Sequence, residues 1–150
     1  MADAKCELPD CNPPSAEIID ILQQCRKIAI VGISTKESRD SNKVARYLIE
    51  NGYEIVPVNP GQREILGNPC FKTLKDIPFP IDMADLFIHP TRVAAIVGQA
   101  MQIGVRVIWM QEGVVHNDSA FKARQAGIQV VMNMCIMKAI KAMKAGGLTS

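Results

Sequence analysis

The sequence predicts a three-layer α/β fold in which a doubly wound, five-stranded parallel sheet lies between two layers of helices. Short aliphatic runs, typical of strands buried on both faces, alternate with stretches of helical periodicity. One pattern of glycine, apolar, polar, apolar, apolar recurs at residues 52–56, 104–108 and 127–131, each time directly after a helical stretch. Glycine readily ends a helix and the β-branched run restarts a strand, so the repetition indicates successive βαβ units.

The length of 150 residues suits one domain with a sizeable core. We expect that domain at residues 14–145, between a flexible extension over residues 1–13 and a tail over residues 146–150. A formal net charge of +2 is too small to indicate nucleic acid or a membrane surface as a partner. The sequence leaves open whether the chain forms a homo-oligomer.

The cysteines and the absence of long apolar segments bear on the cellular setting. Five cysteines, an odd number at irregular spacing, fit a reduced protein better than a secreted, disulfide-linked one. No segment approaches the roughly 18 consecutive apolar residues of a membrane helix, and the polar opening residues lack a signal-peptide core. We therefore expect a cytoplasmic protein without a membrane partner.

The elements of the first half follow from apolar spacing and turn residues. Ser15, after two prolines, is a suitable N-cap for a helix whose apolar positions begin at Ile18. The elements expected in order are a helix from Ser15, a strand over residues 27–31, a polar and basic loop over residues 34–41, a helix over about residues 41–51 and a strand that ends before Asn59.

The second half continues the same alternation. Proline and glycine dominate residues 59–69, which predicts turns, and Pro78 ends a short helical turn that starts at Thr73. Thr91 is a suitable cap for the helix after the third strand. The remaining expected elements are a strand over residues 84–88, a helix from Thr91 to about Met101, a strand over residues 105–110, a helix over residues 118–126, a strand ending at Met132 and a last helix over residues 135–143.

The carboxyl ends of the strands are the expected ligand site. Right-handed crossovers bring all five ends to one rim, where open α/β sheets bind their ligands. The first strand stops at Gly32 and leads into a loop whose hydroxyls and cations include Ser34, Lys36, Arg39 and Ser41. Arginine and lysine pair with phosphate oxygens, and a helix amino terminus favours an anion, so we expect a phosphorylated, nucleotide-like small molecule.

Two common phosphate-binding motifs are missing from this loop. The dinucleotide fingerprint G-x-G-x-x-G needs further glycines soon after Gly32, and the next one is Gly52. The P-loop sequence G-x-x-x-x-G-K-[ST] is also absent. The first absence weakens the case for NAD, and the second argues against phosphoryl transfer at a P-loop.

Several segments together resemble the small single-domain CoA-binding proteins, which are similar in turn to the CoA-binding domain of the succinyl-CoA synthetase α subunit. The resemblance covers about residues 18–143 and implies a Rossmann-like fold with coenzyme A, or an acyl-CoA, bound at the rim. The segments that carry it are residues 28–34 with Arg39 and Ser41, residues 56–60, residues 65–67, residues 107–113 and residues 127–132.

The resemblance also implies which residues of this chain contact the cofactor. We add Ser41 for its hydroxyl, and His89 and Pro90 for their position at the rim. The implied residues are Gly32, Ile33, Ser34, Lys36 and Arg39 at the phosphorylated ADP part of CoA, Asn59 and Pro60 around the nucleotide, and Gln111, Glu112 and Gly113 toward the pantetheine arm.

The sequence offers no assembled set of catalytic residues and no metal site. His89 can donate to a phosphate, act as a base or cap a helix, and Cys135 is either a reactive thiol or a buried helix residue. Glu112 has no second carboxylate at a suitable spacing. We therefore predict a non-catalytic CoA-binding module with a regulatory or carrier role. Two alternatives stay open: an NAD(P)-dependent oxidoreductase, and an interaction subunit with an empty pocket.

Overall fold

The computed structural model describes residues 12–147, and its centre is a sheet of five parallel strands. The strand order is β2-β1-β5-β6-β7, and every neighbouring pair runs parallel. The predicted five-stranded parallel sheet is therefore confirmed. Its strands are β1 (Lys27–Val31), β2 (Glu54–Val58), β5 (Met83–Leu86), β6 (Val107–Met110) and β7 (Gln129–Val131).

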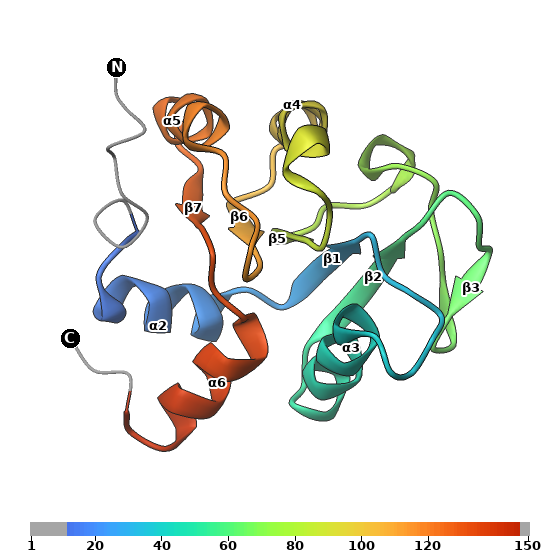
Figure 1. The fold of residues 1–150 in the computed structure, drawn as a ribbon, viewed down its shortest axis with the longest axis horizontal. Helices are drawn as coiled ribbons and strands as arrows, with labels where there is room; N and C mark the ends of the chain where they lie inside the picture. The colour runs from blue at the N-terminus through green and yellow to red at the C-terminus, as the bar shows by residue number, and fades with distance from the viewer. Residues whose placement is uncertain (1–11, 148–150) are drawn as a thin grey trace.

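Helices cover both faces of the sheet, which gives the predicted three layers (Figure 1). One face carries α4 (Val93–Ile103) and α5 (Asn117–Gln125). The other face carries α2 (Ser15–Gln24), α3 (Asp40–Glu50) and α6 (Ile136–Lys144). Each face has its own apolar core between sheet and helices.

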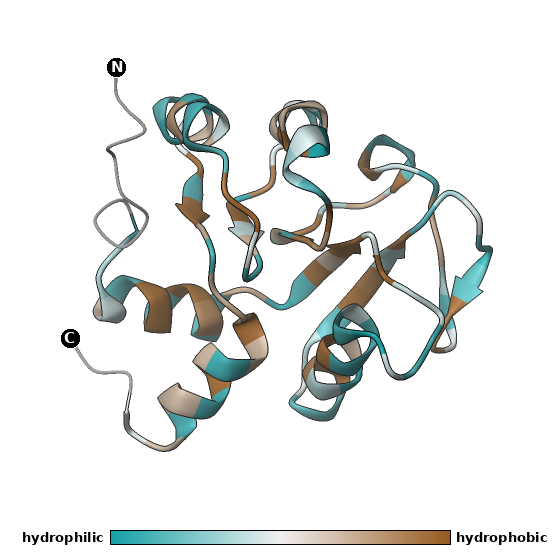
Figure 2. Ribbon diagram, in the orientation of Figure 1, coloured by the Kyte–Doolittle hydropathy of each residue, from teal (hydrophilic) through white to brown (hydrophobic). Residues whose placement is uncertain are grey.

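The alternation of strand side chains supplies both cores. Ala29 and Val31 of β1 enter the core beneath α4 and α5, whereas Ile28 and Ile30 enter the core beneath α2, α3 and α6. The sheet is mainly apolar, and hydrophilic residues lie on the outer sides of the helices (Figure 2). A strand buried on both faces needs such a continuous apolar run, which is why β1 is recognisable in the sequence.

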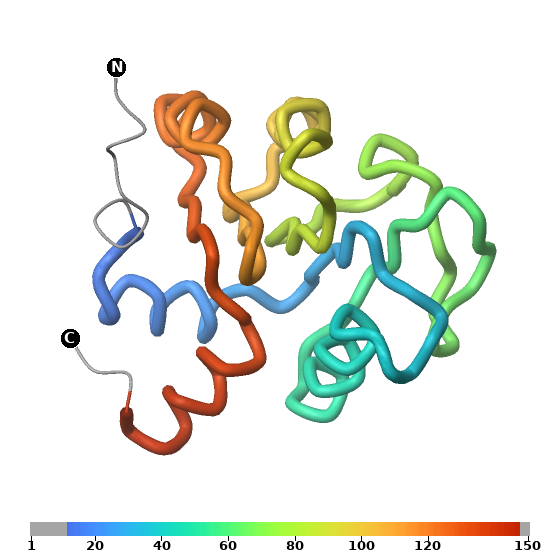
Figure 3. Tube along the Cα trace, in the orientation of Figure 1, coloured from blue at the N-terminus to red at the C-terminus, as the bar shows by residue number. Residues whose placement is uncertain are grey.

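The strand order places a switch point between β1 and β5. From β1 the chain passes through α3 to β2 on one side, and then returns to β5 on the other side (Figure 3). The connections that leave β1 and β5 at their carboxyl ends therefore run in opposite directions. A crevice opens where such connections diverge, so this is the expected binding position in an open α/β sheet.

Two strand boundaries differ by two residues from those predicted, and the others agree to within one residue. β5 ends at Leu86 rather than at residue 88, because Phe87 makes its last sheet hydrogen bond to Val31 O and the chain then turns toward α4. β6 begins at Val107 rather than at residue 105, because the Val105 N–H still donates to Ala100 O at the end of α4.

Two predicted helix caps are wrong. Pro14, not Ser15, is the N-cap of α2, and its carbonyl accepts hydrogen bonds from the first turn of the helix. Thr91 lies inside the 3-10 turn η2 (Pro90–Arg92), and the N-cap of that turn is His89, whose Nδ1 accepts the Thr91 N–H at 3.2 Å. Of the roles open to His89, capping is thus the one observed.

The turn-rich segment after β2 contains a small hairpin that the sequence did not predict. Its strands are β3 (Glu64–Ile65) and β4 (Asn68–Pro69), joined through Leu66 and Gly67 at φ of 54° and 78°. Two consecutive positive φ values are typical of a two-residue hairpin turn. The short helical turn predicted to follow it is confirmed as η1 (Leu74–Asp76).

Most of the predicted flexible extension, residues 1–13, and the last three residues of the predicted tail lie outside the described residues. Within the described part, the Asn12 side chain exchanges two hydrogen bonds with the Met132 backbone, at 2.8 and 2.7 Å. None of the helices between residues 12 and 147 has the length and apolarity that a bilayer crossing requires.

Gly32 allows the backbone after β1 to approach the backbone after β5. It has a φ of 87°, and its N–H donates to Val58 O at 3.0 Å. A Cβ at this position would lie 2.3 Å from Phe87 O. Glycine is therefore required here both by its conformation and by the space available.

We expect Gly32→Ala to destabilise the protein by about 1 to 3 kcal/mol more than Gly52→Ala does, because the added methyl forces β1 and β5 apart. Gly52 is the matched control, since it has a φ of 90° but a Cβ there would meet nothing within 4 Å. Both variants share a left-handed strain of about 1 to 2 kcal/mol. Urea unfolding measures the free energy of unfolding of both variants. Equal losses of stability would show that the close approach of Gly32 to Phe87 O does not restrict this position.

Candidate functional site

A cavity of about 700 Å³ opens at the carboxyl ends of β1, β2, β5 and β6. This volume lies within the range of roughly 300–1,000 Å³ that is usual for small-molecule sites. Its walls come from the loops that follow these strands and from the start of α3. The lining residues are Gly32, Ile33, Ser34, Thr35, Ser38, Arg39, Asp40, Ser41, Asn59, Phe87, Ile88, Gln111, Glu112, Gly113 and Val114.

The loop after β1 is held in shape by side chains from two other segments. Ser41, at the start of α3, accepts the Ser34 N–H on its hydroxyl oxygen at 2.9 Å, and Asn42 donates to Ser34 O at 2.9 Å. Asn59, after β2, donates to Ile33 O at 2.8 Å. Ser41 and Asn59 therefore act first as supports of this loop, since their polar atoms are already engaged within the protein.

The start of α3 presents free N–H groups to the cavity. The N–H groups of Asn42 and Lys43 both donate to Arg39 O, at 3.1 and 3.0 Å. Those of Asp40 and Ser41 lie in the first turn, where no intrahelical acceptor exists, and they find no other acceptor among residues 12–147. Together with the positive end of the helix dipole, these groups favour an anion.

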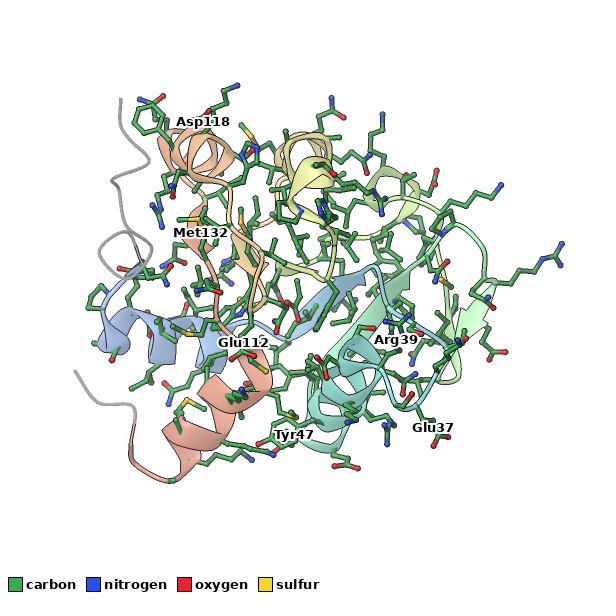
Figure 4. All side chains as sticks on the ribbon, viewed as in Figure 1. Glu37, Arg39, Tyr47, Glu112, Asp118 and Met132 are labelled. Atoms are coloured by element: carbon green, nitrogen blue, oxygen red, sulfur yellow. The ribbon has the colours of Figure 1, made fainter. Side chains whose placement is uncertain are left out.

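Arg39 supplies a cation at the same place. Its side chain caps nothing and forms neither a hydrogen bond nor an ion pair within the described chain. The acidic residue across the cavity, Glu112, is already paired with Lys138 of α6 at 3.0 Å. Figure 4 shows Arg39 over the amino end of α3 and Glu112 over the amino end of α6. The guanidinium is thus available to a negatively charged ligand.

The loop after β6 forms the wall opposite Arg39. The Gly113 N–H donates to Asn133 Oδ1 at 2.8 Å, so a residue that follows shortly after β7 fixes this loop. Asn133 itself has a φ of 57°, a left-handed conformation that asparagine tolerates better than most residues. The sequence places Asn133 at a strand end but does not reveal this role, because the contact depends on the neighbouring strand.

The structure brings most of the predicted site residues together. That they contact a ligand stays a prediction, as it does for those that the cavity does not include. Lys36 and Pro60 are exposed beside it, and His89 and Pro90 lie in the turn that precedes α4. The predicted residues that line the cavity are Gly32, Ile33, Ser34, Arg39, Ser41, Asn59, Gln111, Glu112 and Gly113.

Some lining residues were not predicted from the sequence. Phe87 and Ile88 fall within the expected third strand, so the strand boundary hides their place on the rim. Val114 is an apolar loop residue, and Asp40 carries a charge opposite to that sought for a phosphate site. The available signal in the sequence for Phe87 and Ile88 is that the apolar run continues past Leu86, where β5 ends.

A second, smaller cavity of about 180 Å³ adjoins the first between the starts of α3 and α6. The two cavities share four lining residues, so they meet along a common wall. Cys135, the N-cap of α6, lies on the wall of the second cavity and is 8% exposed. The shared residues are Asp40, Phe87, Gln111 and Glu112.

Beneath the shared wall lies a buried carboxyl group, Asp85 of β5. Its side chain has no exposed surface, and its Oδ1 accepts a hydrogen bond from Gln111 Nε2 at 2.5 Å. Burial raises the pKa of Asp85 to about 8, and the hydrogen bond from Gln111 opposes that shift. Burial therefore favours the neutral form of this carboxyl group.

We find no cluster of potential metal ligands in the described part of the rim. Between residues 12 and 147, no three His, Cys, Asp or Glu side chains lie together as potential metal ligands. His89 is occupied in its cap, where Nδ1 lies 2.9 Å from Thr91 Oγ1. The site offers a cavity with polar walls, together with N–H groups and an arginine that have no partner between residues 12 and 147. This arrangement is suited to binding an anionic small molecule.

Comparisons with known proteins agree with this arrangement. A family model described as a CoA binding domain matches residues 26–141. An uncharacterized protein of Bacillus subtilis, YneT, is 35% identical over 125 residues, which cover 83% of this chain and 93% of that protein. A solved structure of a hypothetical protein from Pyrococcus horikoshii OT3 has a TM-score of 0.85 at 38% identity and covers 88% of this chain and 93% of its own.

Longer relatives are ligases. The α subunit of an ADP-forming acetate–CoA ligase from Pyrococcus furiosus is 31% identical over 96 residues, which are 60% of this chain but only 21% of that subunit. The match to the ligase is thus limited to one part of a much larger protein.

The buried carboxyl group makes stability depend on pH. Because the pKa of Asp85 is raised on folding, the folded state holds a proton that the unfolded state releases between about pH 4 and pH 8. The contribution of Asp85 to the free energy of unfolding is therefore fully present below about pH 4. It falls as the pH rises toward 8, by up to about 1.4 kcal/mol per pH unit. We expect urea unfolding to give this slope for the natural protein and a nearly flat profile for Asp85→Asn.

Asp82→Asn is the matched control for this experiment. Burial acts to raise the pKa of Asp82, but backbone hydrogen bonds from Lys27 and Arg26 and nearby positive charges together outweigh burial and lower this pKa. The contribution of Asp82 to stability therefore changes only at more acidic pH. The control variant should keep the slope of the natural protein between about pH 5 and pH 8. A slope that persists in Asp85→Asn would show that another group titrates.

Proposed function

Because this chain belongs to the CoA-binding domain family, as the match over residues 26–141 establishes, we propose that it binds coenzyme A in the cavity at the carboxyl rim of its sheet. One observation supports this most directly: Arg39, Asp40 and Ser41 line one cavity, and neither the Arg39 guanidinium nor the N–H groups of Asp40 and Ser41 have a partner among the described residues. CoA carries a diphosphate and a 3′-phosphate, which need such donors.

The phosphorylated ADP part of CoA belongs at the loop after β1 and the start of α3. Ser34, Arg39 and Lys36 supply donors there, Lys36 from the exposed side of the loop. Asn59 and Pro60 shape the nucleotide pocket, with Asn59 acting through the loop that it holds in place. The pantetheine arm then runs toward Gln111, Glu112 and Gly113.

The role we propose is binding without catalysis, as a regulator or a carrier of CoA or acyl-CoA. The potential acid–base group, His89, is engaged in a helix cap, and Glu112 is engaged with Lys138. The ligase activity of the longer relatives belongs to proteins of which this chain matches a minor part. We place the function in the cytoplasm, in keeping with the free thiols of Cys25, Cys70 and Cys135.

We expect CoA to raise the Tm of the protein, by the equivalent of about 2.7 kcal/mol at a hundred times its Kd. Arg39→Ala should weaken binding about tenfold, because a charge-assisted contact with a phosphate is lost. Thermal shift and calorimetry with CoA, acetyl-CoA, NAD, NADP and ATP measure both effects.

Arg26→Ala is the matched control, because it removes the same charge at the amino end of β1, opposite the rim. It should leave the CoA affinity unchanged. A Tm shift with NAD or NADP and none with CoA would favour an oxidoreductase, and no shift with any of these ligands would favour an interaction subunit.

A further inference from the structure

Asp85 lies in an apolar environment, where burying a carboxyl group is unfavourable. It lies in the middle of β5, in register with Ile30 of β1 and Trp109 of β6. The helices on this face contribute aliphatic side chains such as Leu22, Leu48 and Ile140. Burying a polar group that is incompletely bonded costs more than burying an apolar residue of similar size. The fold gains nothing from this carboxyl group through packing alone.

The only hydrogen-bond partner of the Asp85 side chain within the described residues is Gln111. Gln111 Nε2 donates to Oδ1 at 2.5 Å, while Oδ2 is buried and has no partner in the part of the chain that the structure describes. Gln111 is itself 4% exposed and lines both cavities at the rim. The hydrogen bond therefore connects the buried carboxyl group of Asp85 with Gln111 on the wall of the two cavities.

The bond to Asp85 decides which end of the Gln111 amide is left for the cavity. With Nε2 directed at Asp85, the other end, Oε1, has no hydrogen-bond partner among residues 12–147. Gln111 Oε1 also retains some solvent-accessible surface, whereas Asp85 Oδ2 is fully buried. A carbonyl oxygen that is nearly buried, unpaired and open to a cavity is an acceptor for an N–H group of a ligand.

We propose that Asp85 is a positioning residue, which orients Gln111 so that its Oε1 accepts an N–H group from the ligand in the cavity. This inference rests on the proposed function and makes it more specific. The pantetheine arm of CoA carries amide N–H groups, whereas the phosphates that precede it offer only acceptors at physiological pH. The Asp85–Gln111 pair thereby selects ligands that carry the arm over nucleotides that lack it.

The test compares two ligands that differ in the arm. CoA and adenosine 3′-phosphate 5′-diphosphate share the phosphorylated nucleotide, so the ratio of their Kd values, measured by calorimetry on the full chain, isolates the contribution of the arm. Asp85→Leu keeps the branched shape of the side chain but removes the acceptor for Gln111. We expect it to weaken CoA about tenfold while leaving the truncated nucleotide unchanged.

Asp85→Asn is the conservative variant, since it retains an acceptor oxygen for Gln111 Nε2. It should keep the natural ratio of the two Kd values. A purely structural role for Asp85 would not separate these variants by ligand, because loosening of the site would weaken both ligands together. Gln111→Met removes the amide itself and should reproduce the selective loss of Asp85→Leu, which keeps the inference testable if that variant fails to fold.

The outcomes separate this inference from the proposed function. If the natural protein binds CoA but Gln111→Met or Asp85→Leu keeps the natural ratio of Kd values, the positioning role is wrong and CoA binding stands. If Asp85→Asn loses CoA selectively to the same extent as Asp85→Leu, the retained acceptor does not matter and the inference also fails. If the natural protein binds neither ligand, both the proposed function and this inference are overturned.

Discussion

The close approach of two backbones at the switch point is the constraint on which the rest of the site depends. The chain leaves β1 through Gly32 and leaves β5 through Phe87, and these segments come so near that no side chain fits at Gly32. This contact sets where the loop after β1 turns and where α3 begins. The cavity lies at this point because the two connections diverge from it in opposite directions.

The polar groups around the cavity divide into those that build it and those left over for a ligand. Ser41, Asn59 and Asn133 direct their side-chain hydrogen bonds to neighbouring loops, which fixes the walls. Arg39 and the first N–H groups of α3 have no partner among the described residues, and all carry positive charge or partial charge. Rigid walls with unpaired donors bind an anion well because little has to be reorganised when it arrives.

The chain is similar to one part of much longer ligases, and its own fold supplies the walls of the cavity. The sheet has separate apolar cores on its two faces, and the ligand cavity is formed from loops of the same chain. The buried Asp85 is a place where the core departs from apolar packing beside the site. Its position beneath Gln111 links the interior of the sheet to the ligand that we propose.

Local pattern determined the architecture of this protein. Three features of the sequence were enough to predict the sheet, its layers and the rim where the cavity lies: the aliphatic run of β1, the helical spacing of apolar residues, and the repeated glycines at 52, 104 and 127. They were enough because strand and helix periodicity are properties of neighbouring residues. The tertiary structure alone decided that His89 caps a turn, that Phe87 and Ile88 leave the sheet to line the cavity, and that Asp85 is buried against Gln111. Those outcomes depend on partners distant in the sequence, and a side chain's hydrogen bonds and burial are fixed only when the fold brings such partners together.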